Sequence, residues 1–229
     1  MSLFEFLRDD GPDAHAGRIN GVVVGIVTNN QDPDGMGRVK LKFPWLSEED
    51  ESNWARVASP MAGKERGLYL LPEVEDEVLV AFEQGDVRFP YVIGSLWNGK
   101  DAPPAKNDDG KNNVRVLKSR SGHVIRLNDE EGKESVEIID KSGKNSIRID
   151  TADNAVTIKS DKDITLSAPN GAIKLDAGSI ELKSSQDTKI EAMNLSTKSS
   201  ANTQIEAGAN LDGKASALMN LKGSVINLN

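Results

Sequence analysis

A three-residue motif, aliphatic–polar–aliphatic, recurs through the second half of the chain and limits what that half can fold into. Three copies fall within residues 163–185, at Ile164–Leu166, Ile173–Leu175 and Ile180–Leu182. Each copy predicts a short β-strand with both aliphatic side chains on one face. Only Gly, Ser, Ala, Asn, Asp and a few other small or polar residues separate the copies, so the neighbouring sequence offers nothing to cover that face.

Further copies extend the pattern in both directions at an average interval of about eight residues, which suits a β-solenoid rung and is too short for a helical repeat. They are Val136–Ile138, Ile147–Ile149 and Val156–Ile158, then the weaker Ile190–Ala192, Leu195–Thr197 and Ile205–Ala207, and finally Met219–Leu221 and Ile226–Leu228. One chain alone would leave these side chains uncovered, whereas three identical chains around one axis would bury them. The motif therefore predicts an intertwined, trimeric triple-stranded β-helix. A single-chain parallel β-helix is the competing structure, although it usually needs longer rungs.

Composition divides the chain into two regions. Every aromatic residue lies at or before Trp97, and eight of the nine prolines precede Asn107. Three aromatic rings at each level would overfill a thin trimeric core, so their absence after Trp97 agrees with the β-helix. Residues 101–118 have the composition of a linker. We therefore expect an N-terminal segment at 1–16, a domain at 17–100, the linker, and the β-helix at 119–229.

The first domain has the pattern of a small β-barrel. Short strands punctuated by Gly and Pro are expected at 22–27, 38–43, 54–57, 68–71, 77–82 and 91–94. The acidic run Glu48–Glu51 is interpreted as a solvated loop, and the sequence from Asn30 to Gly35 resembles the opening of a calcium loop. Leu41 stands where that loop would need its closing Glu, so an Asx-rich hairpin turn is favoured and no metal is expected.

Several functional classes are disfavoured. Residues 1–100 carry a net charge of −7 (10 basic against 17 acidic side chains), which argues against nucleic-acid binding. The two histidines, His15 and His123, lack a nucleophilic partner at a recognisable spacing, so no catalytic residue is assigned and no enzyme activity is expected. The chain has no cysteine, which excludes disulfides and thiolate metal sites. No cofactor is expected, and the N-terminus lacks the features of a signal peptide, which predicts synthesis in the cytoplasm.

The barrel region resembles the OB-fold domain of the VgrG and phage baseplate assembly protein V family. The residues that carry the resemblance are Gly25–Thr28, Asp34–Lys40, Phe43–Trp45, Trp54–Val57, Pro72, Glu77–Phe82, Gly85–Asp86, Pro90, Gly94–Ser95 and Trp97–Asn98, and Ser119–Ile139 resembles the segment after the barrel in that family. The resemblance implies the central spike of a contractile phage tail, a type VI secretion system or a related particle. Such a spike is delivered outside the cell when the particle fires.

Two departures from that family refine the expectation. Only about sixteen residues precede the barrel, where VgrG proteins usually carry a large hub region, so a separate hub protein is expected. The linker leaves no room for the lysozyme domain that some phage spikes insert. The chain is therefore expected to be a bare spike, driven transiently through a target envelope. A polysaccharide-degrading tailspike is the alternative, although residues 98–229 hold no aromatic platform for sugars.

These interpretations assign residues to three surfaces. The hub contact is expected at Leu3, Phe4, Phe6 and Leu7, and a PAAR-type tip protein at Leu221, Ile226, Leu228 and Asn229. The resemblance suggests such a tip protein because no histidine cluster ends the chain to bind a metal. The trimer core is expected to contain Val136, Ile138, Ile147, Ile149, Val156, Ile158, Ile164, Leu166, Ile173, Leu175, Ile180 and Leu182.

Overall fold

The computed structural model describes residues 18–227, apart from the side chains of residues 47–49. Across this range the chain contains β-strands and one short 3-10 turn, η1 (Glu83–Gly85), and no α-helix. An all-β fold was expected and is confirmed. The chain divides into two units, one ending at Thr165 and the other starting at Leu166, and each is described by itself.

The first sheet of the N-terminal unit forms the barrel. Its strands are β1 (Val22–Asn29), β2 (Lys40–Phe43), β3 (Ser47–Glu51), β4 (Arg56–Val57), β7 (Glu77–Phe82) and β8 (Pro90–Ser95), in the order β3-β2-β1-β7-β8-β4. The N–H of Val39 donates to the carbonyl of Ala55 at 3.0 Å, and the N–H of Ala55 donates back at 2.7 Å. These two bonds join the start of β2 to the approach to β4, so the sheet closes on itself. A small hairpin, β5 (Ala62–Gly63) and β6 (Arg66–Gly67), extends from the barrel.

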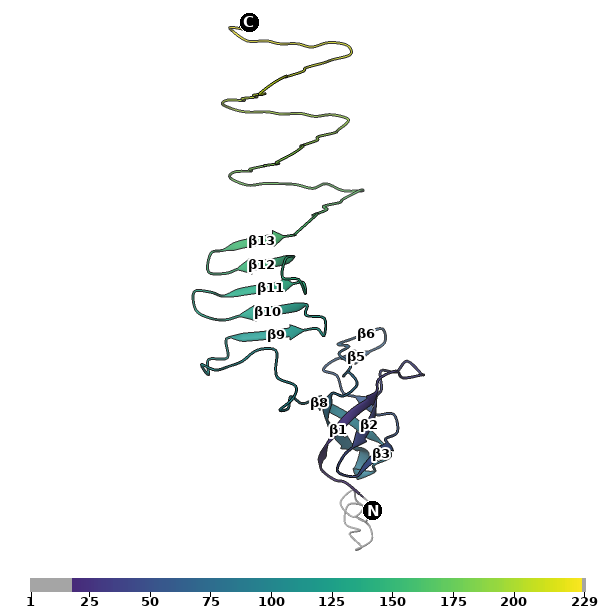
Figure 1. Cartoon of the computed structure of the whole chain (residues 1–229). Helices are drawn as coiled ribbons and strands as arrows, with labels where there is room; N and C mark the ends of the chain where they lie inside the picture. The colour runs from purple at the N-terminus through teal and green to yellow at the C-terminus, as the bar shows by residue number, and fades with distance from the viewer. Residues whose placement is uncertain (1–17, 228–229) are drawn as a thin grey trace, which may run out of the picture. The chain divides into compact units, whose positions relative to one another are not determined.

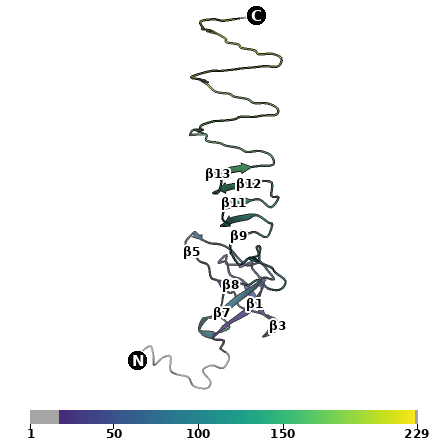
Figure 2. The same ribbon diagram turned by 90° about the vertical axis from the view of Figure 1, so that its left-hand side faces the viewer.

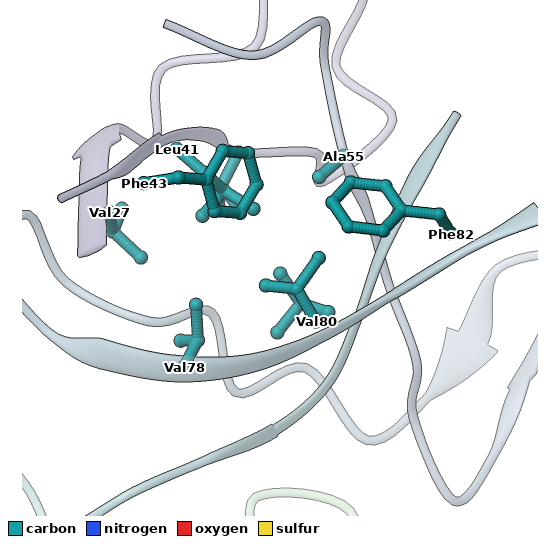
Figure 3. Packing of buried hydrophobic residues seen from close by; sticks show 9 residues of the cluster. Val27, Leu41, Phe43, Ala55, Val78, Val80 and Phe82 are labelled. Carbon is teal, nitrogen blue, oxygen red and sulfur yellow. The ribbon is translucent and has the colours of Figure 1, made fainter. Parts of the chain in front are cut away.

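Strict alternation along the strands builds the barrel core. In β2 and β7 every second side chain is buried, and the buried set comprises Val27, Val39, Leu41, Phe43, Ala55, Val78, Val80, Phe82 and Val92. Figure 3 shows the labelled side chains of this cluster pointing toward one another from facing strands. Gly25 is needed in β1 because a Cβ there would lie 3.1 Å from Cε1 of Phe43 and 3.3 Å from Cγ2 of Val80.

Two expectations for the barrel region are wrong. Leu68–Leu71 is not a strand: Leu68, Tyr69 and Leu70 are exposed, because the run lacks the alternation that would place one face in the core. The acidic run expected to be a loop lies in strand β3 at the edge of the sheet. Edge strands accept charged side chains, and Lys40 Nζ of β2 pairs across the strands with Glu51 Oε2 at 3.0 Å.

The second sheet is a five-stranded antiparallel meander. It contains β9 (Val114–Lys118), β10 (Val124–Asn128), β11 (Ser135–Ile139), β12 (Ser146–Asp150) and β13 (Ala155–Lys159), each paired with the next along the chain. Figure 1 and Figure 2 show these strands stacked as a single layer. The sheet begins at Val114, which lies inside the range 101–118 expected for the linker.

From Ser160 to Asn227 the described chain has no strand, although the aliphatic–polar–aliphatic motif continues. Residues 166–227 instead run as extended passes back and forth, as the green and yellow trace in Figure 1 shows. Strand assignment requires a hydrogen-bonded neighbour, and here successive passes of one chain do not pair with each other. The backbone of these extended passes therefore forms no β-ladder within the described chain.

Candidate assembly surface

One face of the meander carries two columns of aliphatic side chains. The register places Leu117, Ile125, Ile138, Ile147 and Ile158 side by side in one column, and Leu127, Val136, Ile149 and Val156 in the other. All nine are exposed, from 39% for Val136 to 69% for Val156. An apolar face of this size on a single sheet is typical of a surface that a second layer or a partner covers.

The total surface leads to the same conclusion. The chain has an accessible surface of 20258 Å², whereas a folded monomer of 24.7 kDa exposes about 10,000 Å². The excess of about 10,000 Å² exceeds what most obligate interfaces bury. The surplus includes the large aliphatic side chains of residues 164–226, among them Ile164, Leu166, Ile173, Leu175, Ile180 and Leu182, all at least half exposed.

The structure brings half of the expected core residues together on one surface. Val136, Ile138, Ile147, Ile149, Val156 and Ile158 all lie on the aliphatic face of the meander. The sequence interpretation missed Leu117, Ile125 and Leu127, which belong to the same face. Ile125 and Leu127 repeat the aliphatic–polar–aliphatic motif, so that signal was present, whereas Leu117 lay in the expected linker.

The two expected end contacts are described only in part. Leu3, Phe4, Phe6 and Leu7 lie outside the described residues, as do Leu228 and Asn229. Leu221 and Ile226 are described, and both are exposed. Their exposure is what a contact site needs, but the same is true of every aliphatic residue in this part of the chain.

The opposite face of the meander carries an ion-paired cluster on its three middle strands, β10, β11 and β12. Arg126, Glu137 and Arg148 stand directly opposite one another on β10, β11 and β12. The Glu137 side chain is 7% exposed because the two guanidinium groups cover it. Arg148 Nη2 also donates to Asp150 Oδ2 at 2.8 Å, and this bond lowers the pKa of the Asp150 carboxyl below its usual value. Because one face is aliphatic and the other is ionic, the aliphatic face is the one suited to burial.

The turn after β1 is an Asx turn, and residues within the turn donate hydrogen bonds to the carboxylate of Asp32. The Asp32 side chain, 2% exposed, accepts the backbone N–H groups of Asp34, Met36 and Arg38. Arg38 Nε and Nη2 donate to the same carboxylate at 2.9 and 2.7 Å, and this contact holds the pKa of Asp32 well below its usual value. The favoured hairpin-turn interpretation is confirmed, and the carboxylate that a calcium loop would use already has five donors.

Other candidate chemistry is sparse in the part of the chain that the structure describes. Residues 18–227 contain no group of three or more metal-ligating acidic or histidine side chains, and no helix long and apolar enough to cross a membrane. His123 Nδ1 accepts the backbone N–H of Lys141 at 3.3 Å, which is a structural bond between the residue before β10 and the turn after β11. His15 lies outside the described residues.

Comparison with known proteins identifies the barrel. Residues 23–97 match the family described as "Type VI secretion system/phage-baseplate injector OB domain". The type VI secretion system spike protein VgrG1a of Pseudomonas aeruginosa is 31% identical over 128 residues, which are 51% of this chain and 20% of that protein. VgrG3 of Vibrio cholerae is 30% identical over 131 residues (52% of this chain, 13% of that protein), and VgrG2a of P. aeruginosa is 28% identical over 151 residues (62% and 17%).

The matched segments thus span a fifth or less of these relatives' own lengths and between 51% and 62% of this chain. The matched family residues coincide with strands β1–β8 and with the core around Leu41 and Val80. The barrel region is therefore similar to the type VI secretion system and phage-baseplate injector OB domain, and the chain has VgrG spike proteins among its relatives.

Proposed function

We propose that the chain is the central spike of a contractile injection system and forms a trimeric needle. The OB-domain match and the VgrG relatives support a type VI secretion or phage spike role. The main support for a trimeric needle is the aliphatic surface that a single chain leaves exposed. Two further copies of the chain would bury it by three-fold symmetry, without any other partner.

The two parts of the aliphatic surface would be buried in different ways. In the meander, each chain pairs its own strands and would supply one complete face of a three-sided prism. In residues 166–227 the strands of one chain do not pair, so their backbone N–H and C=O groups need partners from the other two chains. These strands would interweave, with each of the three faces built from all chains in turn.

This arrangement suits a mechanical role. A load along the needle would act on backbone ladders shared among three chains around a dry core, and unfolding would require many bonds to break together. The described residues offer no group of three or more acidic or histidine side chains that could hold a catalytic metal ion. We infer that the protein acts by penetrating a target envelope and does not act as an enzyme.

The same proposal assigns partners to the two ends. Residues 1–16 would contact a separate hub protein through Leu3, Phe4, Phe6 and Leu7. The segment with Leu221, Ile226, Leu228 and Asn229 would bind a PAAR-type tip protein through aliphatic side chains, of which those of Leu221 and Ile226 are exposed. The particle would be assembled in the cytoplasm and would carry the spike out of the cell on firing.

Two truncations test the end contacts in particles isolated from cells that produce the variant spike. Deletion of residues 2–10 is expected to leave a trimer that is absent from purified particles. Deletion of residues 222–229 is expected to leave a trimer that is incorporated into particles but lacks the tip protein. The two variants act as controls for each other, because each should lose one partner only. Normal incorporation of the first variant, or retention of the tip protein by the second, would contradict the assigned contact.

A further inference from the structure

The ionic face of the meander carries a cluster of four charged side chains, Arg126, Glu137, Arg148 and Asp150, that are joined by direct hydrogen bonds. Arg126 Nε donates to Glu137 Oε2 at 2.6 Å, and Arg148 Nη1 donates to Glu137 Oε1 at 2.6 Å. Each carboxylate oxygen therefore has its own guanidinium, one on each neighbouring strand. Asp150 holds Arg148 from the other side, through Nε at 3.1 Å and Nη2 at 2.8 Å. The four charges sum to zero.

The aliphatic face specifies the strand register only in part. A slip of two residues between β10 and β11 keeps every side chain on its own face and keeps one aliphatic pair, for example Leu127 opposite Ile138. The other pair is lost, because Ile125 and Val136 would then lie opposite Asp140 and Asp129. The connecting loops and the ionic face supply the rest of the preference for one register.

A slip would disrupt the ionic face. Shifted by two residues in one direction, Arg126 would face Ile139 and Glu137 would face Asn128; in the other direction, Arg126 would face Ser135 and Glu137 would face Val124. Either slip leaves the Glu137 carboxylate without the cross-strand guanidinium of Arg126. A covered charge without its partner is costly, and such groups are effective at selecting a single register.

We propose that Glu137, held between Arg126 and Arg148, is the register lock of strands β10–β12. The lock acts within one chain, so it operates before any partner is present.

Intrachain disulfides in the full chain can read the register directly, because the natural sequence has no cysteine. Val124 and Ile139 are opposite in the observed register and lie on the ionic face. The pair Val124→Cys/Ile139→Cys therefore reports this register, and Val124→Cys/Lys141→Cys reports a two-residue slip. Directly opposite Cα atoms are within disulfide range, whereas the diagonal pair is about 7–8 Å apart and too far without movement.

The test introduces Glu137→Lys into both cysteine pairs, with Glu131→Lys as a control of equal charge change in an exposed loop. We expect the ratio of slipped to native cross-link to rise about tenfold or more with Glu137→Lys and to stay unchanged with Glu131→Lys. Reversing all four charges, with Arg126→Glu, Glu137→Arg, Arg148→Glu and Asp150→Lys, should restore the native cross-link. If Glu137→Lys does not fold, Glu137→Gln is measured in its place and should raise the ratio less.

An unchanged ratio in the Glu137 variants, or an equal change in Glu131→Lys, would overturn the proposal and assign the register to the loops and the aliphatic face. The outcome is separate from that of the proposed needle. Peptide mapping identifies which cysteines are joined, and non-reducing denaturing electrophoresis shows that the cross-link lies within one chain. Light scattering on the same samples reports whether the chains assemble.

Discussion

The barrel and the meander are built from similar residue types and differ in what covers them. In the barrel, Val27, Leu41 and Val80 are fully buried by strands of the same chain. In the meander, Ile125, Ile138 and Ile147 occupy equally regular positions on their strands and remain about half exposed. Alternation alone therefore does not make a core; a sheet must either close on itself or receive a second layer. The barrel closes through Val39 and Ala55, whereas no second layer covers the aliphatic face of the meander in the described part of the chain.

The largest effect is expected from a charge placed in the uncovered region. Leu175→Asp would set three carboxylates at one level of a dry axis, at a cost of several kcal/mol for each charge. We expect residues 166–227 to lose their protection from trypsin while the barrel remains folded. Lys174→Glu, on the neighbouring outward position, should leave the protection intact. If the Leu175→Asp protein resists trypsin as well as the unaltered protein does, the side chain at position 175 does not lie in a buried core.

In the barrel, Leu41→Ala should lower the free energy of unfolding by the same amount whether or not the chains assemble. Leu41 is fully buried, and truncating such a leucine costs about 2–5 kcal/mol. All three tryptophans lie in or beside the barrel, at Trp45, Trp54 and Trp97, so their fluorescence reports its unfolding in denaturant. The decrease in unfolding free energy should be the same at low and high protein concentration. A concentration-dependent decrease would mean that the barrel core also depends on partner chains.

A smaller, pH-dependent effect is expected at the loop between β11 and β12. The Ser142 hydroxyl and the Asn145 groups lower the pKa of Asp140 to about 2 from a usual 3.8. The folded state therefore gains stability from this carboxylate above pH 3.8, and loses it as the pH falls toward 2. Asp140→Asn should lower the melting temperature at pH 7 and have almost no effect at pH 2. An equal decrease at both pH values would show that the charge is not responsible.

Much of the fold was predictable because it depends on local patterns. The alternation of Glu77–Phe82 and the triplets Ile147–Ile149 and Val156–Ile158 each became a strand. The sequence could not show that β3 would form from an acidic run, because an edge strand is defined by its position in the sheet. It also could not reveal that Arg126, Glu137 and Arg148 meet, since cross-strand neighbours depend on the lengths of the intervening loops.

The oligomeric mass of the full chain tests the central claim most directly. Three chains of 24.7 kDa give about 74 kDa, and the aliphatic surface predicts that this trimer is the only folded species in solution. Light scattering coupled to size-exclusion chromatography should give that mass at every concentration tested, with no monomer peak. A monodisperse 24.7 kDa species that melts cooperatively would contradict the account, because one chain would then have covered its own aliphatic face.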